Sequence, residues 1–141
     1  IGIPDTILKA PRKLTPDEWM IMKTHTVIGN RILGMSHSPI FNMAAEIALY
    51  HHEKWDGNGY PMGLAGESIP ECSRIVAIAD TFDALTMKRP YKEAWSVEDS
   101  IAEIKHGSGN HFEPRLVDVF CEVISDIISV KEKWDKQKVK V

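Results

Sequence analysis

The sequence lacks the features that mark disulfide-stapled, membrane-spanning or nucleic-acid-binding proteins. Its two cysteines, Cys72 and Cys121, show no metal-type spacing, and we expect both to be reduced. No apolar run approaches the roughly 18–20 residues that cross a bilayer, and no signal peptide with a basic start and an apolar centre is present. A formal net charge of -3 gives no argument for binding to a nucleic-acid polymer or a membrane surface. These absences predict a cytoplasmic globular protein without a membrane segment.

Length and composition suit one compact domain. The chain has 141 residues, of which 43% are hydrophobic and 26% are charged, and these values are typical of globular proteins. We expect the domain to occupy residues 1–135 and the tail at 136–141 to fray. The sequence starts with Ile1 instead of methionine, and residues 1–5 read as the middle of a protein. We therefore expect the chain to be part of a longer one.

The pattern of apolar residues predicts an all-helical fold. Apolar side chains recur at helical spacing almost everywhere, and strict alternation is absent. Thr15-Pro16-Asp17-Glu18 is typical of a helix start, since threonine can cap, proline fits the first turn and glutamate completes a capping box. Residues 1–14 are expected to be extended or loop-like. The predicted helices cover 16–33 with a break near Thr26, 39–52, 71–87, 96–107, and one long stretch from 114 past Val130.

A histidine doublet followed by a glycine-rich loop is the most informative motif. His51 and His52 close the predicted second helix, where both imidazoles can point inward. The long loop at 53–73 contains four glycines and two prolines, and loops of this length are usually functional or disordered. Little side-chain bulk lets a ligand approach the backbone closely.

Four candidate metal ligands come from three predicted helices: His25, His51, His52 and Asp80. Neutral imidazole suits iron, manganese, zinc, nickel and copper, and a carboxylate can bridge two ions. Arg89 and Lys92 follow Asp80 and can bind phosphate oxygens. Together these residues are compatible with metal-assisted phosphoryl chemistry.

Structural roles compete with each of these interpretations. His25 can be an ordinary hydrogen-bonded helix residue, Asp80 can pair with Arg74, and Arg89 can balance a helix dipole. The doublet is harder to explain without partners, because two buried imidazoles need them. Trp55 and Tyr60 can stack on a nucleobase or anchor the loop. Three further histidines are interpreted as surface or turn residues: His37, His106 and His111.

The order of the motifs resembles the HD-GYP family, a branch of the HD-domain metal-dependent phosphohydrolases. The resemblance runs from Ile1 to about Phe120. It rests on the following segments: Gly59-Tyr60-Pro61 behind His51-His52-Glu53, Met22-Lys23-Thr24-His25, residues 74–86 with Asp80, Arg89-Pro90-Tyr91-Lys92, and residues 109–114. The fold that it implies is an HD-domain-like helical bundle with a long GYP loop.

This resemblance implies a bacterial phosphodiesterase that hydrolyses cyclic di-GMP to a linear dinucleotide or GMP in second-messenger signalling. It implies two or three divalent ions, iron or manganese, held by the four candidate ligands, with a metal-bridging hydroxide as the nucleophile. Arg89 and Lys92 would bind the substrate phosphate, and Gly59, Tyr60 and Pro61 would line its entrance. An N-terminal sensory or receiver domain would regulate the parent protein.

The sequence also departs from the family pattern. No His-Asp dipeptide occurs in the chain, and we expect that pair, with the helices before it, to precede Ile1. Glu113 stands where the family usually has aspartate. We therefore expect this chain alone to bind metal weakly and hydrolyse little, and its uncovered apolar stripes to favour self-association, with a homodimer as one form.

Two other functions stay open. A non-catalytic signalling module that binds a partner protein or cyclic di-GMP is the first. An HD-type phosphohydrolase acting on another nucleotide is the second, which the Gly59-Tyr60-Pro61 loop disfavours.

Overall fold

The computed structural model describes residues 2–36, 38–88 and 93–138, and these ranges contain helices and loops but no strand. The all-α prediction is therefore confirmed. The elements are α1 (Asp5–Leu8), α2 (Pro16–Lys23), α3 (His25–Leu33), α4 (Pro39–Tyr50), the 3-10 helix η1 (Gly66–Ser68), α5 (Glu71–Thr86), α6 (Val97–His106), α7 (Pro114–Glu122) and α8 (Ile124–Lys138). Within the described ranges, every helix is too short or too polar to cross a membrane.

The start of α2 follows its sequence signal. The Thr15 hydroxyl accepts a hydrogen bond from the Glu18 backbone N–H, and the Glu18 side chain accepts one from the Thr15 backbone N–H. This reciprocal capping box satisfies two backbone donors that the first helical turn leaves without a partner. The predicted break falls at Thr24, two residues before the expected position, so α2 and α3 are separate helices.

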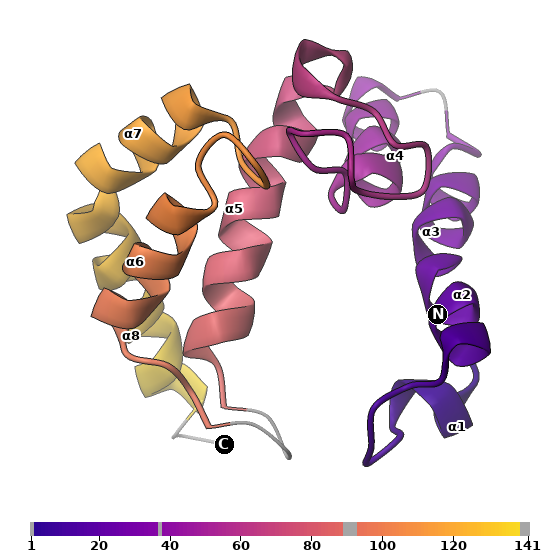
Figure 1. Cartoon of the computed structure of the whole chain (residues 1–141), viewed down its shortest axis with the longest axis horizontal. Helices are drawn as coiled ribbons and strands as arrows, with labels where there is room; N and C mark the ends of the chain where they lie inside the picture. The colour runs from indigo at the N-terminus through magenta and orange to yellow at the C-terminus, as the bar shows by residue number, and fades with distance from the viewer. Residues whose placement is uncertain (1, 37, 89–92, 139–141) are drawn as a thin grey trace.

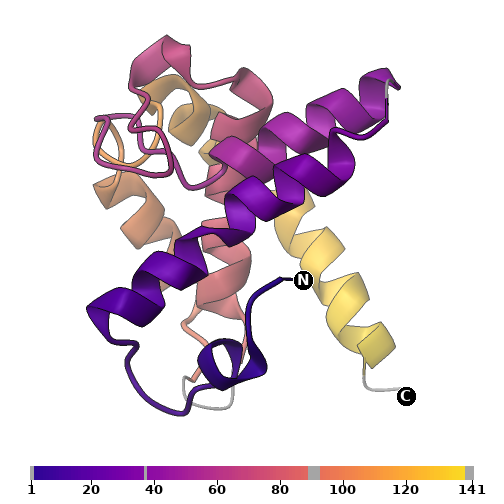
Figure 2. The ribbon, with the colours of Figure 1, turned by 90° about the vertical axis from the view of Figure 1, so that its right-hand side faces the viewer.

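Helices α3 and α4 form an antiparallel pair, and Figure 2 shows them side by side. The Asn30 amide donates to the Ala45 carbonyl at 3.0 Å. Further along, Gly29 lies so close to α4 that an added Cβ would be 3.2 Å from the Ala48 Cβ. This antiparallel register places the start of α3 beside the end of α4.

Helix α5 lies between the α1–α4 part of the molecule and the α6–α8 part (Figure 1). Its Ser73 hydroxyl donates to the Glu46 carbonyl at 3.1 Å, which fixes α5 to α4. Its other face packs against α6 and α7. The main core lies there and consists of Ala77, Ile78, Phe82, Ile104, Phe112, Leu116, Val117 and Phe120.

Two predictions about elements were wrong. The segment at 1–14, expected to be extended or loop-like, contains the short helix α1, where Asp5 pairs with Lys9 at 2.7 Å. The long final helix is divided at Val123, whose backbone (φ -99°, ψ 11°) leaves helical geometry between α7 and α8. The apolar period continues across Val123, so the pattern contained no sign of the break.

Candidate metal centre

Three imidazoles meet where α3 begins and α4 ends. His25 is the first residue of α3, His51 caps the C-terminus of α4, and His52 follows it. Their ring centroids lie 5.7 Å (His25–His51), 5.1 Å (His25–His52) and 4.0 Å (His51–His52) apart. One ring nitrogen from each lies within 4.8 Å of those of the other two, a spacing that a single ion can bridge. The antiparallel helix pair thus assembles the cluster.

Backbone carbonyls fix two of these rings. The Nδ1 atom of His25 lies 2.6 Å from the Met22 carbonyl oxygen, and that of His51 lies 2.8 Å from the Ile47 carbonyl oxygen. Because a carbonyl oxygen only accepts, each Nδ1 carries the proton and donates it. The lone pair is then on Nε2, which is the arrangement of a metal-ligating histidine whose other nitrogen is held by a backbone carbonyl.

His52 is held in its neutral form. Burial lowers its pKa, and the neighbouring His51, His25 and His111 lower it further, to about 3. The ring is therefore uncharged throughout the physiological pH range, as a metal ligand must be.

Tyr60 covers the cluster. Its ring stacks on that of His52 with the centroids 4.9 Å apart, and its backbone N–H donates to the His52 carbonyl at 3.2 Å. Burial, followed by the negative charge of Asp80, raises the pKa of the Tyr60 phenol to about 12. The Lys23 ammonium lies 5.1 Å from the centroid of the same ring. Tyr60 thus connects the histidines to a cation of α2 and a carboxylate of α5.

Glu53 anchors the loop that carries Tyr60. This side chain is 2% exposed, and its carboxylate accepts backbone hydrogen bonds from Met62, Gly63 and Leu64 at 2.6, 3.1 and 3.0 Å. These donors satisfy a carboxylate that would otherwise be costly to bury. The Tyr60–Pro61 peptide bond, next to this anchor, is cis. The anchor closes the loop back onto the helix end that bears the histidines.

Asp80 does not belong to the cluster of the three histidines. It is exposed on α5 and is not one of the groups whose ligand atoms lie within 4.8 Å of one another. The alternative pairing with Arg74 does not form, because Arg74 instead forms an ion pair with the buried Glu113 and donates to the Ile69 carbonyl at 2.8 Å. The structure therefore joins three of the four predicted ligands, and the fourth stays a prediction.

The remaining predicted residues divide into two groups. Gly59 packs directly against the backbone of 52–54, and Pro61 is half-buried beside Tyr60. Arg89 and Lys92, predicted to bind phosphate, lie outside the described residues, and so does His37. His106 is exposed at the end of α6, in line with its prediction.

No functional role was predicted from the sequence for three residues that lie near the site: Glu53, Lys23 and His111. Glu53 and Lys23 were quoted in motifs but given no role. His111, interpreted as a surface or turn residue without company, lies in a turn, but it is half-buried and its charge affects His52. Burial, then the charge of Lys54, lowers the pKa of His111. All three residues stand inside the motifs that carry the family resemblance, and this position was the only sequence feature that pointed to them.

Trp55 serves as an anchor of the loop. Its backbone N–H donates to the His111 carbonyl at 3.0 Å, and its carbonyl accepts from Gly66 at 2.9 Å. The Arg74 guanidinium lies 5.8 Å from the centroid of its ring. The backbone bonds hold the loop in place at Trp55, and the half-buried indole has the Arg74 guanidinium over its ring.

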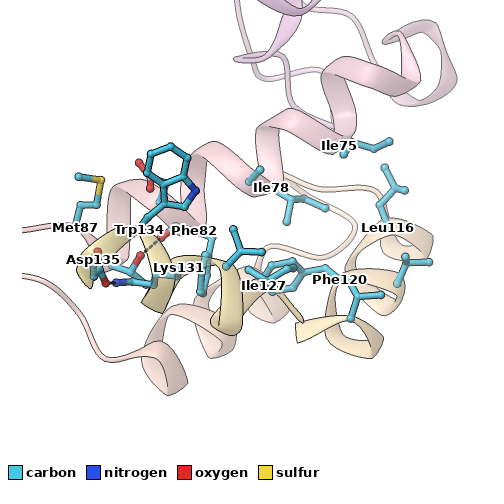
Figure 3. A pocket seen from close by; sticks show the side chains of 16 residues that line it. Ile75, Ile78, Phe82, Met87, Leu116, Phe120, Ile127, Lys131, Trp134 and Asp135 are labelled. Atoms are coloured by element: carbon cyan, nitrogen blue, oxygen red, sulfur yellow. Dashed lines mark hydrogen bonds and ion pairs between the residues drawn. The ribbon is translucent and has the colours of Figure 1, made fainter. Parts of the chain in front are cut away.

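The donor set fits a divalent transition metal. It consists of three imidazoles, two of which are oriented by backbone carbonyls, and imidazole ligands suit iron, manganese and zinc. One hollow of the described structure lies elsewhere. It is an apolar groove of about 680 Å³ between α5, α7 and α8, lined by residues such as Phe82, Ile127 and Trp134, and it contains none of the three histidines (Figure 3).

Comparison with known proteins gives a consistent result. A protein-family model described as "HD domain" matches residues 1–116. The chain is 51% identical over 130 residues to a cyclic di-GMP phosphodiesterase of Thermotoga maritima, covering 92% of this chain and 35% of that protein. It is 47% identical over 131 residues to the 3'3'-cGAMP-specific phosphodiesterase 2 of Vibrio cholerae, covering 93% and 25%. It is also 51% identical over 118 residues to the cyclic di-GMP phosphodiesterase response regulator RpfG of Xanthomonas campestris, covering 84% and 31%.

A solved structure is similar as well. The crystal structure of the cyclic GMP-AMP specific phosphodiesterase V-cGAP3 of V. cholerae matches with a TM-score of 0.64 at 27% identity, covering 79% of this chain and 25% of that one. The chain thus spans between a quarter and about a third of the length of the proteins that it matches.

Proposed function

The chain belongs to the HD-domain family, in its HD-GYP branch, and from that premise we propose that it is the metal-dependent phosphodiesterase domain of a bacterial second-messenger protein. Its substrate is cyclic di-GMP, which it hydrolyses to a linear dinucleotide or GMP in the cytoplasm. The observation that carries this proposal is the convergence of three imidazoles, with the Nε2 lone pairs of His25 and His51 left free beside the stacked rings of His52 and Tyr60.

In this proposal, the residues of the site have separate roles in binding the metal and the substrate. His25, His51 and His52 hold the metal, iron or manganese, in a centre of two or three ions, and Asp80 joins them as an exposed carboxylate on the facing helix α5. When bound, such ions activate a water molecule and polarise a phosphoryl oxygen. Gly59, Tyr60 and Pro61 form the entrance for the dinucleotide, and Arg89 and Lys92 bind its phosphate. A sensory or receiver domain elsewhere in the protein regulates this activity.

A related cyclic dinucleotide, 3'3'-cGAMP, is the second candidate substrate. The relative from V. cholerae named for that substrate is 47% identical to this chain, close to the 51% of the relatives named for cyclic di-GMP. Both substrates share the phosphodiester linkage, so the same metal centre serves either.

The test is hydrolysis by the natural protein loaded with Mn²⁺ or, without oxygen, with Fe²⁺. Cyclic di-GMP and 3'3'-cGAMP are supplied separately, and the products are separated by chromatography. We expect metal-dependent turnover that His52→Ala reduces by roughly a hundredfold or more, since even residues that only support a ligand contribute about 10–100-fold. His106→Ala is the control, because His106 is exposed on α6 away from the cluster.

Binding of a dinucleotide without turnover at any metal loading would instead favour a non-catalytic module. Turnover of neither dinucleotide, with hydrolysis of another nucleotide, would favour a different phosphohydrolase. The 141-residue chain assayed alone is expected to bind metal weakly and hydrolyse little, and substantial hydrolysis by it would contradict that expectation.

A further inference from the structure

Lys23 lies at the rim of the histidine cluster. It is the last residue of α2, it is half-buried, and its ammonium is 5.1 Å from the centroid of the Tyr60 ring. The same ring stacks on His52 at 4.9 Å. A cation over an aromatic face is attracted by the negative charge of the ring face. The position of the ammonium is therefore set by the residue that covers the metal ligands.

No carboxylate of the described residues forms an ion pair with Lys23. Some of the other long cations of the described chain are paired, for example Lys9 with Asp5, Arg12 with Glu18, and Arg74 with Glu113, whereas the exposed Lys105 has no ion pair either. An ammonium carries three donors and no acceptor, so the face of an aromatic ring leaves those donors available to an anion. A half-buried cation held in this way, beside three imidazoles that fit a metal, is suited to an anionic ligand.

We propose that Lys23 is a substrate-binding residue that donates to a phosphate oxygen of the cyclic dinucleotide beside the three-histidine cluster, with the Tyr60 ring fixing its position. This inference rests on the phosphodiesterase function proposed above, and it adds α2 to the Gly59-Tyr60-Pro61 loop and to Arg89 and Lys92 as a further segment that recognises the phosphodiester. The competing role is structural, because a lysine in the last turn of a helix also stabilises the helix dipole.

Lys105 provides the matched control. It lies in the last turn of α6, is exposed, and has no aromatic ring over its ammonium among the described residues. The variants are Lys23→Gln, which removes the charge, Lys23→Arg, which keeps it, and Lys105→Gln, which removes only the dipole interaction. Each is made in the natural protein loaded with Mn²⁺. The readouts are KM and kcat for the dinucleotide, the inhibition constant of inorganic phosphate, bound manganese and the melting temperature.

We expect Lys23→Gln to raise KM and the phosphate inhibition constant by roughly tenfold or more, as loss of a hydrogen bond to a charged group does. Bound manganese and the melting temperature should stay at wild-type values, Lys23→Arg should restore part of the affinity, and Lys105→Gln should change neither constant. An unchanged KM in Lys23→Gln overturns the inference. So does a variant whose main change is lost manganese or a lower melting temperature, or an equal rise of KM in Lys105→Gln.

Failure of the proposed phosphodiesterase function can be distinguished from failure of the proposed role of Lys23. If the wild-type protein loaded with metal hydrolyses no dinucleotide, the phosphodiesterase proposal fails, and equilibrium dialysis of inorganic phosphate against the loaded protein then tests Lys23 alone. Weaker phosphate binding by Lys23→Gln than by Lys105→Gln supports the anion-binding role, and equal binding overturns it.

Discussion

At the scale of single residues, Gly59 determines how closely the loop approaches the histidines. A Cβ at this position would lie 2.4 Å from the Lys54 nitrogen, 2.5 Å from the Glu53 Cα and 2.6 Å from the His52 carbonyl oxygen. All three atoms belong to the backbone, which cannot turn aside as a side chain can. Only glycine lets the chain pass here and bring Tyr60 onto His52.

We therefore predict that Gly59→Ala moves the loop away from the cluster. The expected cost is about 1–3 kcal/mol of unfolding free energy, typical of overpacking, together with at least tenfold weaker Mn²⁺ binding by calorimetry. Gly66→Ala is the control, because its Cβ would meet nothing within 4 Å and only the positive φ of 57° opposes it. If both variants bind Mn²⁺ equally well, the close approach at Gly59 has no role in the site.

The sequence predicted some of these residues and not others, for physical reasons. His25, His51 and His52 were predictable, since helical spacing and a short turn between helices determine which ends meet. Glu53 was not, because its role depends on three loop N–H groups whose direction a pattern of side chains does not contain. Lys23 depends in the same way on where one ring of a distant loop comes to lie.

At the scale of elements, Glu113 joins the start of α7 to the start of α5. Its carboxylate accepts from Arg74 of α5 and, at 2.8 Å, from Arg115 of α7, and Arg115 also reaches Glu71 at 2.5 Å. Burial raises the pKa of Glu113, but hydrogen bonds from Arg115 and Arg74 and their charges outweigh it, so the net pKa is lowered. A carboxyl group with a lowered folded-state pKa stabilises the fold above its unfolded pKa of about 4.3.

The prediction is that Glu113→Gln loses about 3 kcal/mol at pH 7, as removal of one partner of a buried pair does. The loss should shrink as the pH falls through the folded-state pKa, because the wild-type carboxyl then becomes neutral too. Urea unfolding at pH 7 and at about pH 3, well below the unfolded pKa, measures both differences. Glu122→Gln, at the exposed end of α7, should change stability little at either pH. A deficit in Glu113→Gln that is the same at both pH values would exclude the charge as its cause.

The elements themselves were predicted unequally. The cap at Thr15 predicted the start of α2, and in the structure the side chains of Thr15 and Ser96 accept from backbone N–H groups at the starts of α2 and α6. Val123 shows the limit of such reasoning. Leu116 and Phe120 before it are buried, whereas Val130 after it is 52% exposed, although all three side chains line the same groove. A stripe shows that a face is apolar and does not show what it packs against.

At the scale of the whole molecule, apolar side chains remain exposed on α2 and on at least two further surfaces. One is the groove between α5, α7 and α8, where Val130 is 52% and Trp134 is 62% exposed (Figure 3). Another is the α3–α4 pair, where Met35 is 84% and Ile40 is 78% exposed. Clusters of this kind are uncommon on monomers, since apolar surface in water costs about 25 cal/mol per Å².

The 141-residue chain by itself should therefore associate with itself. We predict that its mass measured by light scattering rises with concentration, because pairing of apolar faces removes them from water. Val130→Ser combined with Trp134→Ser should reduce the rise if the groove is the contact, whereas Met35→Ser with Ile40→Ser should reduce it if the α3–α4 pair is. Each double variant is the control for the other. Both variants should still fold, because the four substituted side chains are largely exposed. A constant mass of one chain across the concentration range would mean that these faces are tolerated in water and that self-association has no basis in this structure.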